Sequence, residues 1–152
     1  MIRKARLDDV PTMRALISSY AEQGRMLFRS SSELYESLRD FKLYERDGEI
    51  VGCCALQIVW HDLAEIKSLV VRADCHGNGI GTALVQAVIA EAQELRLGQV
   101  FTLTLEEGFF VRLGFERVAN ESLPMKVWSD CVRCPKQERC DEIAMLLKLG
   151  AT

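Results

Sequence analysis

The sequence predicts one α/β domain that covers residues 1–152. Its length is that of an ordinary domain and suffices to bury a core without disulfides or metals. Short segments with strand character alternate with segments whose apolar residues recur at helical spacing. No internal repeat, low-complexity tract or break in composition divides the chain. These three observations favour a single layered unit that combines a sheet with helices.

The N-terminal half is predicted to contain a strand, two helices and a β-hairpin. Asp8 or Asp9 is expected to cap the first helix, and Ser31 or Ser32 is expected to start the second. The Asp-Gly pair at 47–48 suits a tight turn between two strands. The predicted segments are strand 2–6, helix 9–23, a short helix around 34–38, and strands 41–46 and 49–60.

The C-terminal half is predicted to contain one long helix between strands. Its apolar residues form a single stripe, and Gly98 is expected to end it. The stripe consists of Ile80, Leu84, Val88, Ala92 and Leu95. The predicted segments are strand 64–72, helix 79–97, strand 100–105, a short helix at 108–113, and strands 115–119 and 142–149.

Charge and hydropathy restrict the possible partners. The net charge of -3 argues against nucleic acid, because phosphate backbones select for basic surfaces. The first ten residues carry charges where a signal peptide needs an apolar core, and every apolar run is too short to cross a bilayer. We therefore expect a cytoplasmic protein without nucleic-acid or membrane partners.

The six cysteines raise the question of a metal or disulfide framework. Cys131, Cys134 and Cys140 form a C-terminal trio, but a structural zinc site needs four ligands and no fourth is evident. Without a secretory signal, a disulfide scaffold is not expected either. We expect reduced thiols and no metal. A Cys131–Cys134 disulfide under oxidation and a metal site at the trio are the alternatives.

A glycine-rich loop joins strand 64–72 to the long helix. Gly77, Gly79 and Gly81 alternate, which lets successive backbone N–H groups converge on one point. The helix that begins there adds unsatisfied donors and its positive dipole end. The loop therefore predicts a pyrophosphate site that needs no metal. Nucleoside-triphosphate and dinucleotide loops fit poorly, because the first needs a lysine after the last glycine and the second spaces its glycines differently.

Two motifs resemble signatures of the GNAT acetyltransferase superfamily. Segment 76–81, HGNGIG, is similar to the family's Arg/Gln-x-x-Gly-x-Gly/Ala except at its first position. Segment 109–115, FFVRLGF, resembles the family's Phe-Tyr-x-x-x-Gly-Phe. The order of elements agrees over essentially the whole chain. The resemblance implies a mixed central sheet that is splayed at its middle strands, with helices on both faces and coenzyme A in the gap.

The resemblance also implies which residues hold the cosubstrate acetyl-CoA. The pantetheine arm would pair with the backbone of the splayed strand, and the pyrophosphate would take amides of the glycine loop. His76 replaces the usual Arg or Gln and keeps hydrogen-bond donors, but its charge at neutral pH is less certain, so we expect weaker or more pH-dependent binding. The expected cofactor-binding residues are Leu69, Val70, Val71, His76, Gly77, Asn78, Gly79, Ile80, Gly81, Thr82 and Phe110.

The family's usual reaction is direct attack of an amine on the acetyl thioester. An α-ammonium has a pKa of roughly 8 and a lysine about 10.4, so an α-amine needs less help from a base. Glu65 is the candidate general base, directly or through water; a surface carboxylate is the alternative. A backbone N–H near Leu69 is expected to polarise the carbonyl. Phe110 stands where many members carry a Tyr acid, so water would have to protonate the leaving sulfur, unless no acid is needed.

Within the superfamily, the chain is most similar to the acetyltransferase domain of bacterial N-acetylglutamate synthases and to stand-alone amino-acid acetyltransferases. Segments 27–34, 64–71 and 123–124 carry this similarity. It implies an amino-acid acceptor: L-glutamate, for arginine biosynthesis, or L-glutamine. A dicarboxylic acceptor needs cations, preferably guanidinium groups. The candidates are Arg29 first, Lys126 second, then Arg25, Lys67 and Arg133, for which a solvated surface charge is the alternative, with Trp128 as a possible wall.

Two other functions stay open at this point. One is acetylation of a protein N-terminus, a lysine or another small amine, although the clustered cations disfavour a polyamine. The other is a catalytically weak sensor of coenzyme A, which the departures at His76 and Phe110 would suit. A homodimer is expected only from the family resemblance.

Overall fold

A mixed sheet of seven strands forms the centre of the computed structural model, which describes residues 1–123 and 142–150. The strands lie in the order β1-β2-β3-β4-β5-β7-β6. The strands are β1 (Ile2–Lys4), β2 (Phe41–Arg46), β3 (Glu49–Trp60), β4 (Leu63–Val71), β5 (Gln99–Thr104), β6 (Glu116–Arg117) and β7 (Ile143–Lys148). The α-helices are α1 (Val10–Ala21), α2 (Ser31–Glu36), α3 (Ile80–Glu94) and α4 (Glu107–Arg112).

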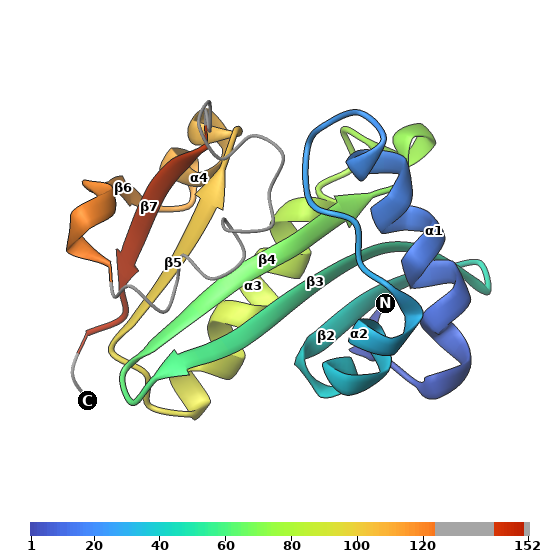
Figure 1. Ribbon diagram of the computed structural model, residues 1–152, viewed down its shortest axis with the longest axis horizontal. Coiled ribbons are helices and arrows are strands. Elements are labelled where there is room, and N and C mark those ends of the chain that lie inside the picture. The colour runs from blue at the N-terminus through green and yellow to red at the C-terminus, as the bar shows by residue number, and fades with distance from the viewer. Residues whose placement is uncertain (124–141, 151–152) are drawn as a thin grey trace.

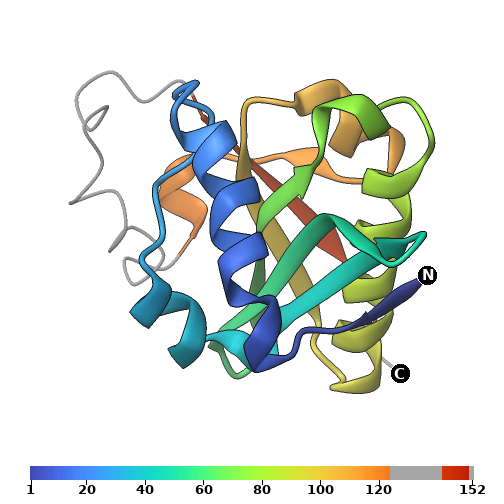
Figure 2. The ribbon, with the colours of Figure 1, turned by 90° about the vertical axis from the view of Figure 1, so that its right-hand side faces the viewer.

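Helices cover both faces of this sheet. Figure 2 shows α1 on one side of the sheet and α3 on the other. The apolar stripe of α1 packs on residues of β2, β3 and β4, among them Leu43, Cys53 and Val70. The stripe of α3 packs on the opposite face, where Leu84 and Val88 meet Leu56 and Ile66. The predicted mixed α/β architecture with helices on both faces is therefore confirmed.

The sheet splays between its two middle strands. β4 and β5 run parallel, but their backbones pair only from Leu63↔Gln99 to Glu65↔Phe101. One more tie follows, in which the hydroxyl of Thr102 donates to the carbonyl oxygen of Ile66 at 2.8 Å. Beyond it the strands diverge, as Figure 1 shows toward the top of the view. The splay implied by the family resemblance is thus present, and it opens a gap at the carboxyl end of β4.

A β-bulge at Ser68 shapes the open half of β4. Pairing with β3 shifts register between Cys53↔Val70 and Ala55↔Lys67, and Ser68 has a φ of 54°. In a regular strand, residues five apart face opposite sides. Ile66 and Val71 nevertheless belong to the same core beneath α3, because the bulge adds one residue between them. The bulge therefore turns the last residues of β4 while keeping the strand packed on both faces.

The predicted element boundaries hold to within a few residues, with three corrections at helix ends. Ser30, not Ser31 or Ser32, caps α2: its side chain accepts from the backbone N–H of Glu33 at 3.1 Å. Asp9 stands at the N-cap of α1, but its carboxylate makes no capping bond to that helix. Arg96, with a φ of 61°, ends α3 before Gly98, and Leu95 of the predicted stripe is exposed. Local side-chain contacts decide such ends more than composition does.

Asp9 ties β1 to the start of α1, and this contact carries a prediction. Its two carboxylate oxygens accept from the guanidinium of Arg3 at 2.9 Å each, and the backbone N–H of Arg6 donates at 2.7 Å. These bonds hold the pKa of Asp9 below its usual value, with the Arg3 hydrogen bond as the largest cause. Asp9→Asn should therefore cost about 2 kcal/mol of unfolding free energy at neutral pH, since hydrogen bonds to charged groups contribute about that much.

The pH dependence of that loss follows from the sign of the shift. A carboxylate with a lowered folded pKa stabilises above its unfolded pKa of about 3.9, and the contribution disappears as pH falls through the folded value. Urea unfolding at pH 7 and at pH 3 should show the difference between wild type and Asp9→Asn shrinking in acid. The exposed neighbour Asp8 gives a matched control as Asp8→Asn. Equal losses for both variants would contradict the assignment.

Candidate active site

A cavity of about 260 Å³ occupies the gap between the diverging strands. Its walls come from the end of α1 and the loop after it, the middle of β4, the end of β5, and the start of α4. The side chains that matter chemically in its lining are Tyr20, Arg25, Arg29, Glu65, Lys67 and Glu106. The structure therefore brings together three segments that are far apart in the sequence, residues 20–29, 65–69 and 102–110, together with Glu142.

The glycine loop adopts the predicted backbone at two of its three glycines, whereas Gly81 lies in the first turn of α3 without a positive φ. Gly77 and Gly79 have φ values of 83° and 76°, and a Cβ at either position would meet nothing within 4 Å. Glycine is thus required by the backbone conformation rather than by packing. Gly79 is also the N-cap of the 15-residue helix α3, and no side chain caps that end. The first-turn amides of α3 therefore offer donors and a positive dipole end to an anion, as a pyrophosphate site requires.

His76 and Tyr20 meet at the last residue of β4. The Nε2 atom of His76 lies 2.7 Å from the carbonyl oxygen of Val71, and the hydroxyl of Tyr20 lies 3.1 Å from the same oxygen. The Tyr20 hydroxyl oxygen and the Nε2 atom of His76 are themselves 3.1 Å apart. Because the carbonyl only accepts, both side chains donate to it, which fixes the hydrogen of His76 on Nε2. His76 is thus anchored to β4, next to the glycine loop with which it was predicted to bind the cofactor.

Glu65 lies where β4 and β5 part. It is half-buried, forms the last backbone pair with Phe101, and lines the cavity. Lys67, two residues further along β4, lines the same cavity, since alternate residues of a strand share a face. Lys67 also borders a second cavity of about 350 Å³ that includes Asp40. Burial raises the pKa of Asp40, and the charge of Lys67 opposes that rise.

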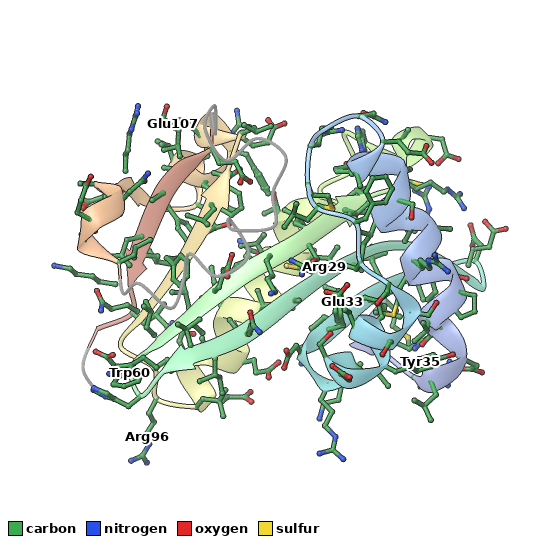
Figure 3. The ribbon with its side chains drawn as sticks, viewed as in Figure 1. Arg29, Glu33, Tyr35, Trp60, Arg96 and Glu107 are labelled. Atoms are coloured by element: carbon green, nitrogen blue, oxygen red, sulfur yellow. The ribbon has the colours of Figure 1, made fainter. Side chains whose placement is uncertain are left out.

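The two arginines of the loop after α1 both reach the cavity. Arg29 is 14% exposed, and its guanidinium lies 3.5 Å from the carboxylate of Glu33, one turn into α2. Arg25 stacks on the ring of Tyr20 at 3.9 Å and lies 3.5 Å from the carboxylate of Glu106, on the other side of the gap. Figure 3 shows Arg29 and Glu33 close together on the side of the sheet that carries α1 and α2. Lys126, Arg133 and Trp128 lie outside the described residues.

Phe110 is part of the core that flanks the cavity. It is 3% exposed, stacks on Phe109 at 5.0 Å between centroids, and meets Phe115 edge-on at 5.1 Å. All three belong to the FFVRLGF motif, which therefore packs α4 against the sheet. Phe110 has no proton to give, so a leaving thiol on this side would have to be protonated by another group.

Sequence reasoning missed the contacts that cross the gap. Helical spacing predicts an apolar stripe on the first helix, and Tyr20 had no role beyond membership of that stripe. Glu106 and Thr102 carried no expectation. The stripe consists of Val10, Met13, Leu16, Ile17 and Tyr20. Their positions became meaningful once the ends of α1 and β5 were placed beside β4. The one available signal was a tyrosine in an otherwise aliphatic stripe.

The cysteines that the structure describes are free and buried. They are Cys53, Cys54 and Cys75. Burial raises the pKa of Cys53 to about 12, so this thiol stays protonated and unreactive. Within residues 1–123 and 142–150, no group of His, Cys, Asp and Glu could hold a metal, and no helix is long and apolar enough to cross a membrane. The trio Cys131, Cys134 and Cys140 lies outside this part of the chain.

Comparisons with known proteins agree with this geometry. The model of the acetyltransferase (GNAT) family matches residues 11–115. The chain is 41% identical over 148 residues to an uncharacterised N-acetyltransferase of Chlorobaculum tepidum, covering 97% of this chain and 96% of that protein. It is 36% identical over 137 residues to an amino-acid acetyltransferase of Mycobacterium tuberculosis, covering 88% of this chain and 78% of the relative.

A solved structure extends the agreement to three dimensions. The crystal structure of N-acetylglutamate synthase from Neisseria gonorrhoeae, complexed with coenzyme A and N-acetyl-glutamate, matches with a TM-score of 0.87 and 27% sequence identity. The match covers 99% of this chain but 35% of the synthase chain. The present chain therefore matches only one part of that larger protein.

Proposed function

The chain belongs to the acetyltransferase (GNAT) family, and from that premise we propose that it transfers the acetyl group of acetyl-CoA to the α-amine of an amino acid. L-glutamate, for arginine biosynthesis, is the first acceptor to test and L-glutamine the second. The observation that supports this most is the arrangement of β4: its splayed middle lines a cavity that holds Glu65 and Arg29, and its carboxyl end leads into the glycine loop at the start of α3. The cytoplasmic location and the homodimer remain predictions.

The residues of the glycine loop suit the diphosphate of coenzyme A. Amides of Gly77 to Thr82 and the N-terminal end of α3 would receive the charge, and the peptide groups of Leu69 to Val71 would receive the arm. A Cβ at Gly81 would lie 3.6 Å from the ring of Phe109 and 3.7 Å from the side chain of Val71, so this glycine packs against the end of β4 and α4. Acetyl-CoA supplies an activated acyl group when bound; the chain supplies orientation and proton handling.

The walls of the cavity carry the groups that an acyl transfer to an α-amine needs. Glu65 would accept the proton of the attacking ammonium, directly or through water. A backbone N–H near Leu69, which the bulge at Ser68 reorients, would polarise the acetyl carbonyl. Arg29 would hold a carboxylate of the acceptor. Two relatives, an amino-acid acetyltransferase and an N-acetylglutamate synthase bound to N-acetyl-glutamate, support the acceptor class.

An acceptor panel tests the proposal. Purified protein with acetyl-CoA would be assayed for thiol release against glutamate, glutamine, other amino acids, a polyamine and a peptide with a free N-terminus and a lysine. We expect turnover with free amino acids, and glutamate ahead of alanine. Turnover with the peptide alone would replace the acceptor class, and tight coenzyme A binding without turnover on any acceptor would identify a sensor instead.

Arg29→Ala tests how the acceptor is held. The Arg29 side chain is mostly buried and lines the cavity, and hydrogen bonds to charged groups contribute about 1.5–3 kcal/mol each. We expect the KM for glutamate to rise about tenfold to a hundredfold while that for acetyl-CoA stays within about twofold, because the glycine loop is untouched. Arg96→Ala is the matched control: Figure 3 shows Arg96 pointing away from the cavity at the opposite end of the sheet. An unchanged KM for the acceptor would remove Arg29 from the site.

A further inference from the structure

The open edge of β4 is not free along its whole length in this structure. At Val71, the carbonyl oxygen accepts from Tyr20 at 3.1 Å and from His76 at 2.7 Å. The backbone N–H of the same residue points at the Tyr20 hydroxyl at 3.5 Å. A carbonyl oxygen has two lone pairs, so two donors saturate it. The backbone N–H and the carbonyl oxygen of Val71, called the Val71 peptide below, are therefore both engaged by side chains.

Val71 lies on the path that the proposed function requires. The cavity reaches along β4 as far as Leu69, and the glycine loop begins a few residues after Val71. A pantetheine arm that joins the loop to the cavity must pass Val71 and, like an added strand, take its hydrogen bonds from the open edge. It cannot pair with Val71 while the Tyr20 hydroxyl stays there.

Tyr20 is held in this place from several sides. It lies in the last turn of α1, whose stripe packs on β3 and β4. Arg25 covers its ring at 3.9 Å and lies 3.5 Å from Glu106 across the gap. His76, 3.1 Å away, shares the same carbonyl. Tyr20 is thus the point where α1, the glycine loop and the far side of the gap meet.

We propose that Tyr20 is a positioning residue that occupies the Val71 peptide in the free protein and yields it to the pantetheine arm when acetyl-CoA binds. The proposal rests on the proposed function. The hydroxyl accepts from the N–H of Val71, which is at a strand edge, and shares the carbonyl oxygen of Val71 with His76. It also competes with the cofactor, because binding must first break the Tyr20 bond. The apparent Kd for coenzyme A is the intrinsic Kd divided by the fraction of protein in which Tyr20 has left Val71.

Tyr20→Phe separates this role from a merely structural one. The variant keeps the ring under Arg25 and removes only the hydroxyl. If the hydroxyl stabilises the free state alone, its loss should tighten coenzyme A binding about twofold to tenfold, the range that a net neutral hydrogen bond spans. Titration calorimetry with coenzyme A measures this. Melting curves should show Tyr20→Phe less stable than wild type without ligand. This difference in melting temperature should disappear at saturating coenzyme A.

Tyr35→Phe serves as the matched control. Tyr35 is 49% exposed on α2, and its hydroxyl makes no hydrogen bond to another residue in the described part of the chain. Figure 3 shows it on the outer side of α2, away from the gap. The control should leave coenzyme A affinity unchanged.

The remaining outcomes each overturn the proposal. Unchanged affinity, with equal destabilisation in the free and bound states, would make Tyr20 a packing residue only. Weaker binding by Tyr20→Phe would mean that the hydroxyl contacts the cofactor itself. Failure of the wild-type protein to bind coenzyme A would defeat the proposed function, which is a separate and recognisable result.

Discussion

Gly79→Val is expected to raise the KM for acetyl-CoA about a hundredfold, which corresponds to about 2.7 kcal/mol of lost binding. Gly79 sits at a φ of 76° and forms the N-cap of α3, at the centre of the predicted pyrophosphate site. A β-branched residue does not tolerate this conformation, so the loop must change shape and its amides no longer converge. Losing one or two charge-assisted N–H contacts accounts for an effect of this size.

The hairpin turn supplies a control of the same backbone geometry. Gly48 has a φ of 80°, and a Cβ there would also meet nothing within 4 Å. Gly48→Val and Gly79→Val should therefore each lose about 1–2 kcal/mol of unfolding free energy. Only Gly79→Val should also change the kinetics. Steady-state assays with both variants, together with urea unfolding, separate strain from function. If both variants bind acetyl-CoA like wild type, the loop is a structural turn and the site lies elsewhere.

The contrast between these two glycines shows what the sequence could predict. Both needed a positive φ, and both turns were predicted at the correct residues, because glycine, asparagine and aspartate reveal backbone demands locally. The pyrophosphate site was predicted from the same kind of signal, one short loop read beside the start of a helix, and the structure places that loop at the N-terminal end of α3. The long helix followed from periodicity, which is likewise a local signal.

The other end of the site depends on contacts between distant segments. Ser68 adopts a left-handed conformation without being glycine, so nothing in its type announced the bulge. Arg25 was one of several loop cations until its place between Tyr20 and Glu106 was known. Tyr20 changed from an apolar helix residue to a hydrogen-bond donor when the end of α1 was placed at the edge of β4. Such roles depend on tertiary placement, which periodicity does not encode.

Glu65→Gln is expected to lower kcat with glutamate about a hundredfold at pH 7. Glu65 lines the cavity where β4 and β5 separate, and a positioned general base typically contributes 10²- to 10⁴-fold, so about a hundredfold is the conservative end. Glutamine keeps the size and most of the packing but does not accept a proton at neutral pH. The variant must therefore use the fraction of acceptor whose amine is already neutral.

The pH dependence distinguishes base catalysis from simple charge. The pKa of about 8 belongs to a chain-terminal ammonium. In a free amino acid the neighbouring carboxylate raises the pKa of the ammonium, so the neutral fraction rises about tenfold per pH unit from pH 6 and is still rising at pH 9. The ratio of wild-type to variant kcat should thus be largest at pH 6 and shrink toward pH 9. Glu106→Gln makes the same charge change in the same cavity, but its carboxylate is paired with Arg25, so its ratio should stay flat. A ratio for Glu65→Gln that is equally flat would mean that Glu65 only attracts the acceptor's ammonium, and that a water molecule or the amine itself handles the proton.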